Sequence, residues 1–83
     1  MDYRAVVRQL VEKLLARRND KKGFSDADSL FLSGRLQSVD AVEVVILLEE
    51  EWGVDFAKIG FEMNLIDNVD AILALRQHSE VPK

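Results

Sequence analysis

The chain of 83 residues has no cysteine, one proline and one histidine, His78. The absence of cysteine excludes a disulfide framework and a thiolate metal site, and one histidine is too few for most His-based metal sites. If the function requires a free thiol, that thiol must come from an attached group. The longest unbroken apolar stretch, Val44 to Leu48, is far shorter than the roughly 20 residues that cross a bilayer.

The chain is too short for several domains, and its charged residues begin too early for a secretory signal peptide. Its length predicts one domain over residues 1–83, with a modest core. Charged residues begin at Asp2 and Arg4 and recur along the chain, which does not fit a secretory signal peptide. We therefore expect a cytoplasmic protein without a membrane span.

The net charge of −4 is distributed unevenly. Residues 1–35 carry eight Lys/Arg and five Asp/Glu, whereas residues 36–83 carry three and ten, which gives net charges of +3 and −7. Phosphates would be repelled by the acidic second half, so nucleic acid is not an expected partner. A basic protein surface fits that half better.

Two helical stretches and a long connection are predicted in the first two thirds of the chain. Apolar residues recur at three- and four-residue steps from Tyr3 to Leu15, which predicts an amphipathic helix with Asp2 as its N-cap. A second helix is predicted from Ser38 to Trp52, ended by Gly53. The connection 19–37 is turn-rich yet contains several apolar residues, so we expect it to lie over the core.

The remainder predicts one short helical turn and one further helix. Residues 54–68 are irregular, with a turn expected around Phe61–Ile66. Asp67 or Asn68 then caps a last helix, which ends near His78, and we expect a frayed tail from residue 79. These elements predict an all-α fold, a small four-helix bundle of three main helices and one short helix. Trp52 and Phe56 are expected to be core anchors.

No catalytic motif accompanies these elements. The sequence has no Gly-rich phosphate loop, no nucleophile elbow and no metal-ligand spacing. A Ser-His-Asp set can be drawn with Ser38 and His78, but nothing in the sequence orders it, so a small hydrolase is a minor hypothesis. We expect neither autonomous catalysis nor a metal site.

The most specific pattern surrounds Ser38. Asp40 follows two positions later, Val42-Glu43 at four and five, and Glu49-Glu50-Glu51-Trp52-Gly53 from position eleven. In this register the chain resembles the acyl carrier protein family, strongly over residues 34–56 and more weakly along its whole length. The resemblance implies that Ser38 carries a covalent 4'-phosphopantetheine, whose thiol holds acyl intermediates as thioesters. It also implies two kinds of partner, a phosphopantetheinyl transferase and the acyl-transferring or condensing enzymes of fatty-acid, polyketide or related biosynthesis.

The chain departs from the family pattern at three points. Gln37 stands where the family nearly always has Asp, Val39 replaces Leu, and the stretch Val54 to Val69 is longer by two residues than in typical fatty-acid carriers. Together these differences indicate a specialised carrier. Because the family's Asp helps the transferase dock, Gln37 motivates an alternative, a non-catalytic interaction module of the same fold that is not modified.

The residues around Ser38 allow both structural and functional interpretations. A serine before an apolar helical run is commonly an N-cap, and acidic side chains on a helix commonly form a solvated face. The predicted helix 38–52 contains five Asp/Glu and no Lys or Arg, which is more acid than solubility requires. We therefore predict that Asp40, Glu43, Glu49 and Glu50 form a docking surface for Lys/Arg on partners. Arg17, Arg18, Lys21 and Lys22 are expected to be solvated. Val42, Ile46 and Phe56 are expected to line a small apolar pocket for the carried group.

Two properties are left open by the residues. Fatty acyl, polyketide, aminoacyl and D-alanyl carriers share these features, so the pattern does not choose among those cargoes. A monomer is the expected state for a carrier that visits several enzymes.

Overall fold

The computed structural model describes residues 2–78, and its first element is the helix α1, Tyr3–Arg17. The Asp2 carboxylate accepts a hydrogen bond from the Ala5 N–H at 3.1 Å, as predicted for an N-cap. Its buried face consists of Val7, Val11, Leu14 and Leu15. Just beyond the helix, Asn19 adopts a left-handed conformation with a φ of 58°, which turns the chain away.

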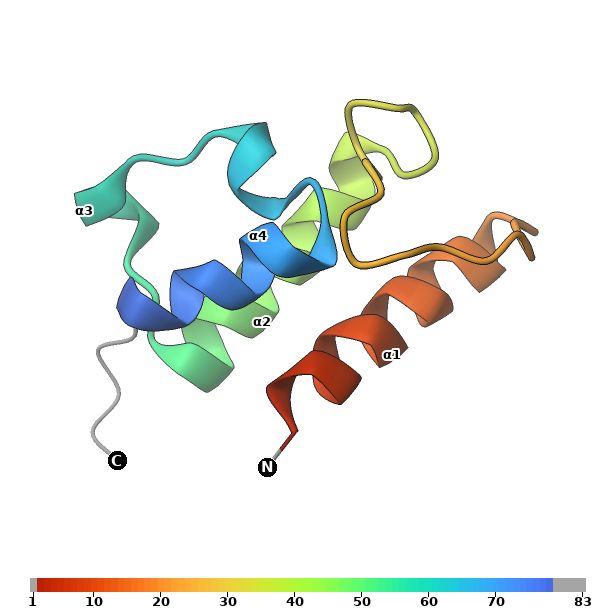
Figure 1. Ribbon diagram of the computed structural model, residues 1–83. Helices are drawn as coiled ribbons and strands as arrows, with labels where there is room; N and C mark the ends of the chain where they lie inside the picture. The colour runs from red at the N-terminus through yellow and green to blue at the C-terminus, as the bar shows by residue number, and fades with distance from the viewer. Residues whose placement is uncertain (1, 79–83) are drawn as a thin grey trace.

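Helix α2, Ser38–Trp52, has the predicted bounds. Its last turn closes at Gly53, whose φ of 66° is left-handed and whose N–H donates to the Leu48 carbonyl. The helix runs antiparallel to α1, so the end of α1 lies beside the start of α2 (Figure 1). Burial of Val44, Leu48 and Trp52 offsets the weak helix propensity of its β-branched residues.

The segment after α2 contains two short elements where the sequence predicted one. Helix α3, Phe56–Ile59, is followed by the 3₁₀ helix η1, Met63–Ile66. The prediction of a turn around Phe61–Ile66 matches η1, but α3 was missed. A four-residue helix is too short to show a periodicity, and its only local signal is Asp55, whose carboxylate caps the Ala57 N–H at 3.0 Å.

The last helix is α4, Val69–Ala74, which continues as the 3₁₀ helix η2, Leu75–His78. Asn68 is its N-cap and accepts from the Ala71 N–H at 2.7 Å, whereas Asp67 serves the loop before α2. Helix α4 packs against α1 and lies across the molecule in front of α2 (Figure 1). The predicted frayed tail, residues 79–83, lies outside the described residues.

One apolar core joins all of these elements and confirms the predicted all-α bundle. Trp52 and Phe56 belong to it, as expected. The connection between α1 and α2 contributes Leu30, Phe31 and Leu36, which confirms that it lies over the core. Among residues 2–78, every helix is too short or too polar to span a bilayer, and no group of His, Asp and Glu is arranged to hold a metal ion.

Candidate functional site around Ser38

Ser38 is the first residue inside α2 and is exposed. The N-cap position belongs to Gln37, so the interpretation of Ser38 as an N-cap is wrong. Within residues 2–78, the Ser38 hydroxyl makes no hydrogen bond. Its oxygen is therefore available for chemistry, and the first turn of the helix does not depend on it.

Asp40 performs the capping that Ser38 does not. Its Oδ2 accepts a hydrogen bond from the backbone N–H of Gln37 at 3.0 Å. An acidic group in the first turn also suits the positive end of the helix dipole. Asp40 thereby holds the backbone on which Ser38 is presented.

The same carboxylate is covered by the end of α1. The Arg18 Nε lies 2.5 Å from the Asp40 Oδ2, and the Asp40 side chain is only 7% exposed. The prediction that Asp40 belongs to an exposed docking surface is therefore wrong. The physical reason is tertiary, because the last residues of α1 cross the first turn of α2.

Glu43 is also partly engaged. One of its oxygens, Oε1, pairs with Arg17 at 2.7 Å. The other, Oε2, is buried and has no hydrogen-bond partner among residues 2–78. Glu49 and Glu50 differ, since both are exposed and neither is ion-paired within the described residues. Of the four predicted docking residues, these two are freely presented.

The outer face of α2 also carries an apolar stripe. Val39, Val42 and Ile46 follow one another at three- and four-residue steps, and they are 66%, 56% and 45% exposed. The predicted pocket of Val42, Ile46 and Phe56 is wrong, because Phe56 is buried in the core while the other two face outward. Helix α2 is therefore apolar on two faces, one buried in the core and one exposed. The sequence shows apolar residues at both sets of positions, but the predicted pocket assigned the exposed set to the interior.

A different cleft adjoins Ser38. Ser38 and Gln37 lie at an open cleft of about 530 Å³, whose apolar lining comes from the preceding loop and from η1. The lining residues are Phe31, Leu32, Gly34, Leu36 and Met63. Leu32, 69% exposed, is the most accessible apolar side chain of the set.

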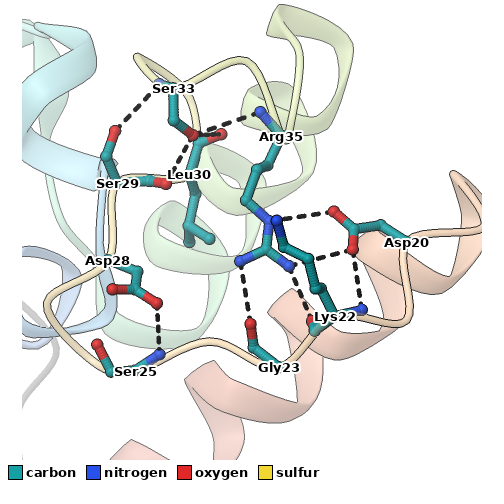
Figure 2. Close-up of polar contacts among 9 residues, drawn as sticks. All are labelled: Asp20, Lys22, Gly23, Ser25, Asp28, Ser29, Leu30, Ser33 and Arg35. Carbon is teal, nitrogen blue, oxygen red and sulfur yellow. Dashed lines mark hydrogen bonds and ion pairs between the residues drawn. The ribbon is translucent and has the colours of Figure 1, made fainter.

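The loop before Ser38 is held by an arginine that the sequence analysis did not single out. Figure 2 shows the Arg35 guanidinium donating to both carboxylate oxygens of Asp20, and to the carbonyls of Lys22 and Gly23. The hydrogen bond from Arg35 is the main cause that lowers the pKa of Asp20. Arg35 thus ties residues 20–23 to the segment that leads into α2.

Asp67 fixes the other side of this loop. Its Oδ1 accepts from the backbone N–H groups of Phe31 and Leu32, each at 2.8 Å, and its carbonyl accepts from Leu30. Burial favours a higher pKa for Asp67, but hydrogen bonds from the Ser29 side chain and the loop backbone outweigh it and lower the pKa. The sequence analysis considered Asp67 only as a helix cap, because a contact across 36 residues leaves no local pattern.

Comparisons of the chain with protein-family models, with curated proteins and with solved structures find no match. The resemblance to acyl carriers therefore rests on the residues themselves and on their register along α2.

Proposed function

We propose that the protein is an acyl carrier, in which Ser38 is the attachment point of a 4'-phosphopantetheine. The observation that carries this proposal is the state of the Ser38 hydroxyl, which is exposed at the first position of a helix and free of any capping role. A carrier serine needs access rather than activation, because the transferase supplies the catalytic groups. The carrier itself has no catalytic role in this proposal.

The surroundings of Ser38 suit the attached group. The N-terminus of α2 offers backbone N–H groups and the positive end of a helix dipole to a phosphodiester charge. The cleft lined by Phe31, Leu32, Leu36 and Met63 adjoins Ser38 and offers an apolar surface to the arm. When attached, the group supplies the thiol that the chain lacks and that forms the thioester with the cargo.

The outer face of α2 supplies the contact with partner enzymes. Glu49 and Glu50 attract basic groups, mainly by steering the encounter, and the stripe of Val39, Val42 and Ile46 offers apolar contact beside them. Partners of this chemistry include the transferase and the enzymes that load or condense the acyl group. The carrier acts as a cytoplasmic monomer in this proposal.

Mass spectrometry tests the attachment directly. The protein is co-expressed with a broad-specificity phosphopantetheinyl transferase, and its intact mass is compared with that of Ser38→Ala and of Ser25→Ala, a second exposed serine in a loop. We expect one added phosphopantetheine on the native chain and on Ser25→Ala, and none on Ser38→Ala. An unmodified native chain, or a modification that persists in Ser38→Ala, would overturn the proposal.

Gln37 favours a second candidate function, an unmodified interaction module of the same fold. Gln37 occupies the N-cap and forms a capping box with Asp40, so a neutral amide stands where the family has the acidic residue that the transferase uses for docking. This candidate predicts an unmodified chain that still binds basic proteins, with an affinity that falls as salt rises. Restoration of modification by Gln37→Asp would separate the two candidates.

A further inference from the structure

A groove runs between the end of α1 and the first turns of α2. It has a volume of about 520 Å³, and its walls are Arg17 and Arg18 on one side and Val39, Asp40, Val42 and Glu43 on the other. It lies directly beside the apolar stripe of α2, since Val39 and Val42 belong to both. Any protein that docks on the stripe near Ser38 therefore also meets the arginines of α1.

At the end of the stripe near Ser38, the most exposed charged side chain of the groove is a cation. The Arg17 side chain is 49% exposed and uses its Nη1 for Glu43, whereas the two acids of the groove are less exposed, Glu43 at 37% and Asp40 at 7%. A guanidinium has five N–H donors in a planar fork, so Arg17 retains donors for a further carboxylate.

The opposite end of the stripe has the opposite sign. Glu49, Glu50 and Glu51 are exposed on α2 and unpaired within the described residues. Ten residues of helix separate Val39 from Glu49, which corresponds to about 15 Å along the axis. The surface therefore has a cationic end near Ser38, an apolar middle and an anionic far end.

We infer that this surface binds a partner enzyme whose docking face also has two signs, with a carboxylate opposite Arg17 and Lys/Arg groups opposite Glu49 and Glu50. Because Arg17 pairs with Glu43, six residues before Glu49, the two groups of the partner lie about 9 Å apart along the α2 axis. The inference rests on the proposed carrier function and adds the acidic element of the partner. A second copy of the chain, packed antiparallel, would also match these charges. Three exposed apolar side chains are too few to form the centre of a stable dimer interface of roughly 1,600 Å². A partner enzyme that binds transiently does not need such an area, so it is the occupant.

Three synthetic helical peptides with the same apolar stripe serve as probes of the isotope-labelled full chain, with amide chemical shifts as the readout. One peptide has Glu at one end and Lys at the other, one has Lys at both ends, and one has Glu at both. We expect the mixed peptide to bind two- to fivefold more tightly than the all-Lys peptide, a ratio on the order of that for one exposed ion pair. Shifts should cover Arg17 and the outer face of α2.

Arg17→Gln is the decisive variant, since it removes the exposed guanidinium and releases Glu43. It should reverse the order, so that the all-Lys peptide binds best. Lys22→Gln makes the same change in net charge at an exposed residue outside the groove, and it should keep the native order. A thermal melt confirms that both variants are folded.

Three results would overturn the inference: tightest binding of the all-Lys peptide to the native chain, binding of none of the peptides, or self-association by sedimentation that Arg17→Gln abolishes. The attachment test on Ser38 is independent of all three. A chain that is modified yet prefers the all-Lys peptide overturns this inference and leaves the carrier function standing, whereas an unmodified chain overturns the carrier function itself.

Discussion

The acidic residues at the two ends of α2 have different tasks. At its start, Asp40 is covered by Arg18 and caps the helix, and Glu43 is paired with Arg17. At its far end, Glu49 and Glu50 point into solvent. Acidic residues of α2 are therefore structural where α1 crosses the helix, and they are available to partners where α1 does not. The number of acidic residues in the sequence does not reveal this distinction.

The largest effect is expected from the buried acid that holds the loop against the core. Asp67→Ala leaves the buried or part-buried N–H groups of Phe31 and Leu32 without their acceptor, and it should lower the free energy of unfolding by about 2–3 kcal/mol. Urea unfolding measures this change. Glu50→Ala, an exposed acid, is the matched control and should stay within about 0.5 kcal/mol of the native chain. Equal effects of the two variants would contradict the division between structural and available acids.

A somewhat smaller loss is expected at the start of α2. Asp40→Ala removes the acceptor for the Gln37 N–H and leaves Arg18 without its partner, which should cost about 1–2 kcal/mol. Asp40→Asn keeps an acceptor and should recover part of that loss. If Asp40→Ala unfolds like the native chain but associates more weakly with basic partners, Asp40 is a docking residue after all.

Acidification should destabilise the fold by protonating carboxylates that accept hydrogen bonds in the folded chain. The pKa values of Asp67, Asp20 and Asp26 are all lowered by hydrogen bonds from the loop or from arginines. A lowered pKa in the folded state means that the stabilisation is present above the unfolded value of 3.8 and is lost as pH falls through the folded value. Unfolding midpoints in urea, measured from neutral pH to pH 2, should therefore fall mainly below about pH 4.

Asp67→Asn sharpens that experiment. The amide cannot titrate, so this variant should be less stable than the native chain at neutral pH and should lose less stability on acidification. A pH profile parallel to the native one would show that Asp67 contributes nothing to the acid transition.

The smallest change in stability, with the clearest functional readout, is expected at the N-cap. Gln37→Asp replaces the Gln37 acceptor of the capping box by a shorter, charged one, which should add about 0.5 kcal/mol or less to the free energy of unfolding. The same variant should accelerate phosphopantetheine transfer, measured by mass as a function of time. Gln37→Asn, a capping residue without the charge, is the control. Faster modification by both variants would assign the effect to capping rather than to recognition by the transferase.

Local sequence was sufficient for most of the secondary structure. The bounds of α2 follow from Ser38, its apolar periodicity and Gly53, and the start of α1 follows from Asp2, because caps and helical periods are short-range effects. Short elements without a period escaped prediction, as α3 shows. The place of Ser38 at the start of this helix was also predictable, but the role of Gln37 as its N-cap was not.

The sequence by itself determined an all-α chain, the placement of Ser38 at the start of an acidic helix, and the dependence on an attached group for any thiol. Only the tertiary structure decided which acids are free, because the pairs Arg18–Asp40 and Arg17–Glu43 join residues more than 20 positions apart. It likewise decided that Asp67 anchors the loop and that Val42 and Ile46 face outward. The physical reason is the same in each case. Periodicity and capping act within a few residues of one another, whereas ion pairing and burial depend on which helices cross.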